Sequence, residues 1–462
     1  MSKVLSHKQR EKDYIFLELT RSICPVCKKT IDAQIRVRDE KVYMFKRCLE
    51  HGEFEGLISS DINMYKYSLA FNKAGKIPLA FGSEVKNGCP QDCGICPDHQ
   101  QHTCLALLEI TEQCNLCCAS CYASSSNITK FLDLETIDFM LKQYVHYEGE
   151  PEVLQISGGE PTLHPEIFKI IELAQAKKIK HLMLNTNGIR LAEDEYFVKR
   201  LAGYNIELYL QFDGFTPNIY GVLRGNKEVF RLKEQALALI AKYRIPSTLV
   251  TTLVKGLNDS QIGDIIHYAI KNRFVKGVNF QPIIYLRDDP KFDPLERITL
   301  PDVVKEIEKQ TEFLFKVSDF IPLPCSYPTC CSLTYALIRG KEVVPVTRNI
   351  DIVKYLDYFS NRIISSPASI LRKASEGLWS ASASLNAMQV LKDFSCICGI
   401  PFRSGVLEQL KDNIFRITVK PFMDGYTFDL KRAMKCCIHV LQPNGKLIPF
   451  CVYNNLYRNR QK

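Results

Sequence analysis

The chain has 462 residues, 46% hydrophobic and 24% charged, which is ordinary globular composition with enough apolar material for a folded core. The N-terminal stretch has no apolar run typical of a secretory signal, and no window approaches the roughly 18 apolar residues of a membrane span. We therefore expect a cytoplasmic protein. The net charge of +9 is not concentrated in a basic tract, so we expect no DNA partner.

The 19 cysteines are the most unusual feature of the composition. Their number is odd, and in a reducing compartment this favours metal sites over a disulfide framework. They also gather in short stretches of the chain, as metal ligands do. These stretches are 24–48, 89–121, 325–331, 396–398 and 436–451.

Changes of pattern along the chain predict four regions. They are an N-terminal metal-knuckle domain at 1–80, a cysteine-bearing loop at 81–104, a strand–helix region at 105–300 and a cysteine-rich C-terminal domain at 301–462.

The first region contains two paired-ligand turns among strand-like segments such as "KVYMFKRC". Cys24 and Cys27 form the first pair, and Cys48 and His51 form the second. Two such pairs about twenty residues apart are typical of a closed tetrahedral site. The spacing predicts one mononuclear zinc or iron ion and does not distinguish the two metals.

The loop region contains "CPQDCGIC", which spaces Cys89, Cys93 and Cys96 as x3 and x2. Cys104 follows eight residues later and is a candidate fourth ligand. Four cysteine thiolates are the usual ligands of a closed iron–sulfur cluster. We therefore predict an auxiliary 4Fe–4S cluster here.

Residues 105–300 alternate apolar runs with segments of helical periodicity. The expected strands are 105–111, 152–157, 181–186, 206–212, 247–253 and 277–283. Six strand–helix units predict a parallel sheet and an α/β fold, namely a partial (βα)6 TIM-type barrel. Active sites of such folds lie at the carboxyl ends of the strands.

"CNLCCASCY" follows the first of these strands and places Cys114, Cys117, Cys118 and Cys121 within eight positions. Three thiolates would leave one iron of a cluster open to a further ligand, as catalytic zinc sites keep one position open. Spacing alone allows two triples, since either Cys117 or Cys118 can be the middle ligand.

The C-terminal region supplies eight further cysteines, together with an expected helix near 302–316 and an expected hairpin at Asn444-Gly445. We assign Cys325, Cys330, Cys437 and Cys451 to a second auxiliary 4Fe–4S cluster. Cys331 and Cys436 remain alternatives to their neighbours, and Cys396 and Cys398 are too close together to interpret. Residues 363–391 predict an amphipathic helix that either packs in the core or lies on a membrane surface.

The order of a strand, a C-x3-C-x2-C loop, a second strand and "SGGEPTL" (157–163) resembles the radical S-adenosylmethionine (SAM) enzymes. In that superfamily the x3/x2 spacing makes Cys118 the middle ligand of the SAM-binding cluster, with Cys114 and Cys121. The resemblance implies that Gly158, Gly159, Glu160 and Pro161 bind the amino group of SAM. "NTNG" and "LQFDG" resemble further SAM or substrate positions, at Asn185, Asn187, Gln211 and Asp213.

The whole arrangement resembles the archaeal tetraether lipid synthase family, which includes methyltransferases of 6-hydroxymethyl-7,8-dihydropterin. The match is carried by 88–122 and 420–455. It implies a reduced cluster that cleaves SAM to a 5′-deoxyadenosyl radical, which removes hydrogen from an unactivated carbon. No separate catalytic triad is required.

Three functions are therefore expected, in this order. The first is formation of carbon–carbon bonds on lipid chains, and the second is methylation of a pterin or modification of a peptide or RNA. The third is a multi-cluster electron carrier without SAM chemistry. The expected partners are a lipid or small-molecule substrate, a low-potential donor resembling flavodoxin or ferredoxin, and a peripheral membrane contact.

Overall fold

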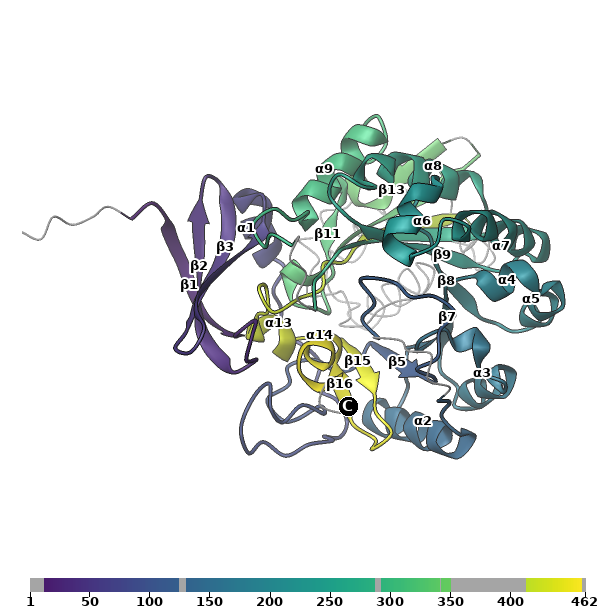
Figure 1. The fold of residues 1–462 in the computed structure, drawn as a ribbon, viewed down its shortest axis with the longest axis horizontal. Helices are drawn as coiled ribbons and strands as arrows, with labels where there is room; N and C mark the ends of the chain where they lie inside the picture. The colour runs from purple at the N-terminus through teal and green to yellow at the C-terminus, as the bar shows by residue number, and fades with distance from the viewer. Residues whose placement is uncertain (1–11, 124–129, 287–291, 341, 350–412, 459–462) are drawn as a thin grey trace, which may run out of the picture.

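The computed structural model describes residues 12–123, 130–286, 292–340, 342–349 and 413–458. These residues contain a four-stranded antiparallel sheet and a 12-stranded mixed sheet, at the left and right of Figure 1. The segment predicted at 363–391 and the Cys396/Cys398 pair lie outside the described residues.

The N-terminal sheet is a simple meander followed by one helix. Its elements are β1 (Ile15–Ile23), β2 (Thr30–Arg38), β3 (Lys41–Cys48), β4 (Gly52–Ser59) and α1 (Ile62–Leu69). The strand predicted from "KVYMFKRC" coincides with β3. Alternate residues such as Ile35 and Met44 are buried and pack with Ile62 and Tyr65 of α1, because successive strand residues point to opposite faces.

Six parallel strands form the middle of the large sheet, as the sequence predicts. They are β5 (Leu105–Glu109), β6 (Val153–Ser157), β7 (His181–Thr186), β8 (Glu207–Gln211), β9 (Ser247–Leu253) and β10 (Val275–Pro282). Their pairings are all parallel. The predicted α/β class is confirmed, and the sheet is curved and open rather than closed.

Helices cover one face of this sheet (Figure 1). They are α2 (Leu134–Glu148), α3 (Ile167–Ala176), α4 (Ile189–Glu193), α5 (Glu195–Leu201), α6 (Pro217–Arg224), α7 (Val229–Tyr243) and α8 (Ile262–Lys271). Asp133 caps α2 by accepting a hydrogen bond from the Thr136 amide at 2.7 Å. Ala106 and Leu108 pack with these helices, whereas Leu105 and Leu107 point to the opposite, inner face.

The C-terminal region continues the same sheet at both ends, which the sequence did not predict. Its elements are α9 (Leu300–Gln310), β11 (Ile321–Pro322), β12 (Ser332–Arg339), β13 (Glu342–Pro345), β14 (Ile414–Val419), α13 (Leu430–Met434), β15 (Ile438–Leu441), β16 (Leu447–Pro449) and α14 (Phe450–Val452). Strand β14 pairs in parallel with β10, and β15 pairs in parallel with β5. The backbone groups at both edges of the six-stranded sheet are therefore hydrogen-bonded to a further strand.

Two local predictions in this region need correction. Helix α9 ends at Gln310, before the predicted 316, because Glu312 and Phe313 adopt positive φ angles of 50° and 64°. The hairpin at Asn444-Gly445 exists, but its loop is longer than two residues. The Gln442 amide donates to the Lys446 carbonyl at 2.9 Å, and Gly445 supplies the left-handed φ of +83° that such a loop requires.

Buried polar contacts attach the N-terminal sheet to the C-terminal region. The Lys46 ammonium donates to the Gly425 carbonyl at 2.5 Å and to the Ser22 hydroxyl at 2.9 Å. The Thr20 hydroxyl donates to Asp429 at 2.7 Å. The N-terminal knuckle is therefore held against the segment that carries the last cysteines, as Figure 1 shows near α13.

We expect Glu207→Gln to destabilise the fold in a pH-dependent way. Burial alone would raise the pKa of Glu207, but His181 at 3.0 Å and Arg416 at 3.9 Å lower it from 4.5 to about 2. The ionised carboxylate therefore contributes stability above pH 4.5, and this contribution is lost as the pH falls through 2. The variant should be less stable by up to about 3 kcal/mol at pH 7.

Urea unfolding of wild type and variant in parallel checks this prediction. The difference in unfolding free energy should narrow as the pH falls below 4.5. Glu195→Gln is the control, because the Glu195 carboxylate pairs with Lys242 on the surface and such pairs contribute little. If the difference in unfolding free energy between wild type and Glu207→Gln did not change with pH, the prediction that ionised Glu207 stabilises the fold would be contradicted.

Candidate active site

The three-thiol loop lies at the carboxyl end of β5 and opens onto a cavity. Cys114, Cys118 and Cys121 are half-buried and line this cavity, whereas Cys117 is exposed and does not. The Cys121 amide donates to the Cys118 carbonyl at 3.3 Å. This arrangement favours the predicted triple with Cys118 as its middle member. Three thiolates that line one cavity suit an iron–sulfur cluster that keeps one iron open.

Arg224 is a member of this site that the sequence analysis missed. It reaches from α6 to the sulfur of Cys118 and forms a two-pronged ion pair with Asp213, at 2.7 and 2.8 Å. Asp213 is fully buried and does not line the cavity. In this structure Asp213 therefore positions Arg224 instead of facing a ligand. An arginine eleven residues after the aspartate carries no recognisable sequence signal.

The GGEP turn after β6 is bonded to the cysteine loop. The amides of Gly159 and Glu160 each donate at 2.8 Å, to the carbonyls of Thr111 and Gln113. Gly158 has a φ of +140°, and a side chain on it would meet the Thr111 carbonyl at 2.4 Å. Glycine is therefore required for the close approach of the two loops.

Glu160 is buried and organises the third loop of the site. Its carboxylate accepts from the Thr162 and Thr186 hydroxyls at 2.6 and 2.8 Å, and from the Asn187 amide at 2.7 Å. Burial raises the pKa of Glu160, and these hydrogen bonds oppose the increase. The glutamate therefore ties GGEP to "NTNG". Of the predicted residues in these loops, Gly158, Gly159, Glu160, Asn185, Asn187 and Gln211 line the cavity, while Pro161 does not.

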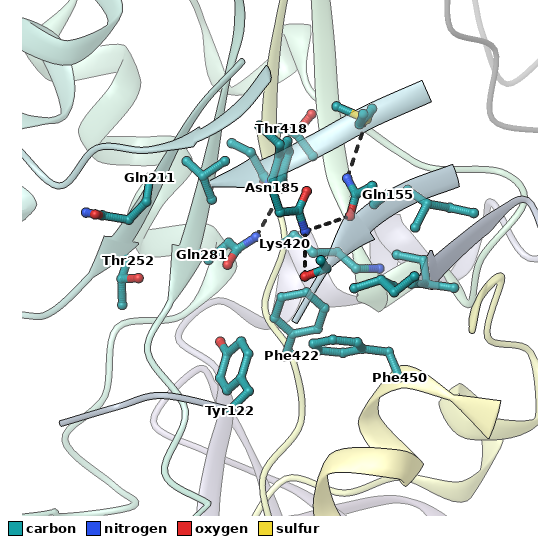
Figure 2. Close-up of a pocket in the computed structure, with 18 of the residues that line it drawn as sticks. Tyr122, Gln155, Asn185, Gln211, Thr252, Gln281, Thr418, Lys420, Phe422 and Phe450 are labelled. Atoms are coloured by element: carbon teal, nitrogen blue, oxygen red, sulfur yellow. Dashed lines mark hydrogen bonds between the residues drawn. The ribbon is translucent and has the colours of Figure 1, made fainter. Parts of the chain in front are cut away.

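The cavity has a volume of about 480 Å³ and extends from the three-thiol loop along the inner face of the sheet. Inward-facing residues of successive strands line it, as alternation along a strand requires. Figure 2 shows carboxamide, hydroxyl and ammonium groups in its middle and aromatic rings on one side. Residues from both halves of the chain line it, including Leu105, Leu323, Cys331 and Ile438.

The predicted N-terminal metal site is assembled as expected. One ligand atom from each of Cys24, Cys27, Cys48 and His51 lies within 4.8 Å of the others. The Cys27 and Cys48 sulfurs are 3.9 Å apart, and His51 Nδ1 is 3.5 Å from the Cys48 sulfur. Tetrahedral zinc with bonds of about 2.0 to 2.3 Å separates its ligands by roughly 3.3 to 3.8 Å. The four side chains fit a single ion.

We expect Cys48→Ala to remove one equivalent of metal from the chain and to unfold the N-terminal sheet locally. The physical reason is that metal binding in small closed sites contributes directly to folding. Metal analysis by mass spectrometry, with limited proteolysis of residues 12–60, measures both effects. Unchanged metal content would contradict the assignment of Cys48 as a metal ligand. Cys117→Ala is the control for loss of a thiol elsewhere in the chain.

The remaining cysteines group differently from the two predicted auxiliary sets. Cys104, Cys325 and Cys437 place their sulfurs within 4.8 Å of one another, with 3.8 Å between Cys325 and Cys437. Cys104 and Cys437 precede the paired strands β5 and β15, and the Cys104 amide donates to the Cys437 carbonyl at 3.0 Å. Parallel pairing of two strands distant in sequence therefore places Cys104 beside Cys437 and Cys325.

Three members of the first predicted set do lie close together. The thiols of Cys89 and Cys93 form a hydrogen bond, and Cys96 lies near both of them. The Lys420 ammonium lies 2.9 Å from the Cys330 sulfur. Burial alone would raise the pKa of Cys330, but Lys420 and Arg432 lower it. The number of auxiliary clusters remains a prediction. No helix in the described parts of the chain has the length and hydrophobicity that crossing a membrane requires.

Comparison with known proteins gives matches to two family models. Residues 108–269 match the radical SAM superfamily, and residues 16–60 match the HMPTM N-terminal zinc ribbon domain. These ranges contain the three-thiol loop with GGEP and the N-terminal knuckle, respectively.

Individual relatives extend the likeness beyond these ranges. The 7,8-dihydro-6-hydroxymethylpterin dimethyltransferase of Methanocaldococcus jannaschii is 33% identical over 95% of this chain and 94% of its own length. The GTP 3′,8-cyclase of Haemophilus ducreyi is 27% identical over 41% of this chain and 57% of its own length. Among solved structures, Streptococcus suis SuiB bound to S-adenosylmethionine matches with a TM-score of 0.38 and 16% identity, over 46% of this chain and 48% of its own.

Proposed function

Because the chain belongs to the radical SAM superfamily, in the family of the M. jannaschii dimethyltransferase, we propose that it methylates a pterin. The observation that carries the proposal is the similarity over 95% of the chain, which spans the knuckle, the three-thiol loop and the C-terminal strands. Enzymes of this superfamily use a 4Fe–4S cluster and SAM, and when bound this pair supplies a 5′-deoxyadenosyl radical.

The described residues have separate roles in this proposal. Cys114, Cys118 and Cys121 would hold the cluster, and Gly158 and Gly159, which line the cavity beside these cysteines, would contact SAM through their backbone. The substrate would occupy the cavity next to this loop. Enclosure by the sheet positions it and excludes water from the reacting carbon.

Lipid coupling, the first function expected from the sequence, receives no support from these relatives, whose names refer to a pterin and to GTP. It remains an alternative that the experiment below addresses. The electron-carrier alternative is set aside because the chain is a radical SAM enzyme. A low-potential donor of the flavodoxin or ferredoxin type would supply the electron, and acidic proteins of this kind suit a chain with a net charge of +9.

Mass spectrometry of pterins and lipids from cells expressing the chain tests the proposal. Cells with the wild-type chain should contain pterins heavier by one or two methyl groups, and cells with Cys118→Ala should not. Coupled lipid chains with unchanged pterins would contradict the proposal and favour the alternative.

A further inference from the structure

Lys233 is a fully buried lysine on α7 that does not line the cavity. Lysine is rarely buried completely, because its ammonium group loses its hydration. It occupies a core-facing position of the helix, with buried Val229 one turn before it and buried Leu237 one turn after it. An apolar residue would pack at this position without that cost. The lysine therefore indicates a specific polar contact.

The side chain of Lys233 reaches the "NTNG" turn (185–188) between β7 and α4. Helix α7 lies against α4 (Figure 1), and the Lys233 nitrogen donates to the Asn187 carbonyl. Burial lowers the pKa of Lys233 to about 7, although the Asp213 carboxylate opposes the decrease. The ammonium and the neutral amine both carry N–H groups. The bond to the carbonyl is therefore available in either protonation state.

Each of the four polar atoms of Asn187 has a partner within the protein. Its backbone amide donates to Glu160 at 2.7 Å, and its side-chain oxygen accepts from the Ile189 amide at 3.0 Å. Its side-chain nitrogen donates to the Asn115 side-chain oxygen at 2.7 Å and lies 4.0 Å from the Cys114 sulfur. Its carbonyl is the acceptor for the lysine. Asn187 therefore connects α7 to the three-thiol loop.

Loss of the lysine would affect this connection at both ends. The Asn187 carbonyl would be buried without a donor, which is unfavourable. The turn can relieve this cost by rotating the peptide, and that rotation also moves the Asn187 side chain away from Asn115. Asn187 and Cys114 both line the cavity. A change below the turn is therefore transmitted to the wall of the SAM site.

We propose that Lys233 is a positioning residue for SAM binding: it fixes the "NTNG" turn through the Asn187 carbonyl, and the Asn187 side chain fixes the three-thiol loop at Asn115. Without the lysine, the turn would populate further conformations, and only one of them would accept SAM. The apparent affinity for a ligand falls in proportion to the competent fraction. This inference concerns SAM binding alone and applies to any substrate of the enzyme.

Lys233→Met provides the first test, because it keeps an unbranched apolar side chain and removes the N–H groups. Anaerobic equilibrium dialysis of labelled SAM with the cluster-loaded chain measures the dissociation constant. We expect it to rise about tenfold or more. The rate of SAM cleavage at saturating SAM should stay within about twofold of wild type, since only binding is affected. Lys242→Met is the control, because Lys242 lies on the exposed side of the same helix and pairs with Glu195.

Asn115→Ala provides the second test, at an exposed position of the three-thiol loop. It removes the acceptor of the Asn187 side chain, so SAM binding should weaken about fivefold or more. The double variant should bind SAM no more weakly than Lys233→Met alone, because both substitutions act through Asn187. Independent, additive losses would show that the lysine affects SAM binding by another route.

Iron content and the electron paramagnetic resonance spectrum show whether each variant has assembled its cluster. Wild-type SAM affinity in cluster-loaded Lys233→Met would overturn the proposal, as would a lowered rate that saturating SAM does not restore. If Lys233→Met does not assemble the cluster, Asn115→Ala decides: weakened SAM binding supports the proposal, and wild-type affinity overturns it. The pterin is absent from these experiments, so their failure leaves the proposed function unaffected.

Discussion

We expect Cys118→Ala to abolish reductive cleavage of SAM and Cys117→Ala to leave it close to the wild-type rate. Cys118 lines the cavity beside Arg224, whereas Cys117 is exposed and does not line it. Loss of one of three thiolate ligands should prevent assembly of the cluster. The measurement is 5′-deoxyadenosine released after dithionite and SAM are added to the anaerobically reconstituted chain.

The Cys117→Ala and Cys118→Ala variants are matched controls for each other because the two cysteines are adjacent in the chain. Both variants lose one thiol from the same loop, so general damage from oxidation or handling affects them equally. Iron content and the low-temperature electron paramagnetic resonance spectrum report the cluster directly. Loss of product in Cys117→Ala with retention in Cys118→Ala would show that the triple is Cys114, Cys117 and Cys121.

The second large effect is expected for Gly159→Ala. A Cβ at this position would lie 2.2 Å from the Gln113 carbonyl oxygen and 2.8 Å from that of Glu112. These are backbone atoms directly before Cys114, so the clash can be relieved only by moving the three-thiol loop or the GGEP turn. A displacement of about 1 Å at a reacting site can cost a hundredfold in rate. We therefore expect SAM cleavage to fall at least about a hundredfold.

Gly203→Ala is the control for this substitution. Gly203 is exposed, has no positive φ, and its added Cβ would meet one atom, the Arg200 carbonyl oxygen, at 3.3 Å. The rate of SAM cleavage by Gly203→Ala should match that of the wild type. Measurement of SAM affinity by equilibrium dialysis separates weaker binding from a damaged cluster. Wild-type SAM cleavage by Gly159→Ala would contradict the close packing of the two loops.

Local patterns predicted the middle of the fold well. Alternating strand and helix patterns predict the six parallel strands of the sheet. The knuckle ligands were predictable because their two pairs sit on turns of a local antiparallel sheet. Such features depend on residues that are close in sequence. Periodicity and ligand spacing therefore predict them directly.

Long-range pairing could not be predicted in the same way. The placement of Cys104 beside Cys437 depends on parallel pairing of β5 with β15, more than 300 residues away. The ion pair of Arg224 with Asp213 depends on the path of α6 over the sheet. The residues that line the cavity are likewise spread over separate strands, each of which contributes isolated residues. These positions become recognisable only when the strand order is known.

The central claim is radical cleavage of SAM beside a cavity that accepts a pterin. Its most direct test is the rate of 5′-deoxyadenosine formation by the reduced, cluster-loaded wild-type chain, measured with 6-hydroxymethyl-7,8-dihydropterin, with an archaeal-type dialkyl lipid, and with neither. We expect formation of 5′-deoxyadenosine that the dihydropterin accelerates and the lipid does not. Absence of 5′-deoxyadenosine in every reaction, or acceleration by the lipid alone, would contradict it.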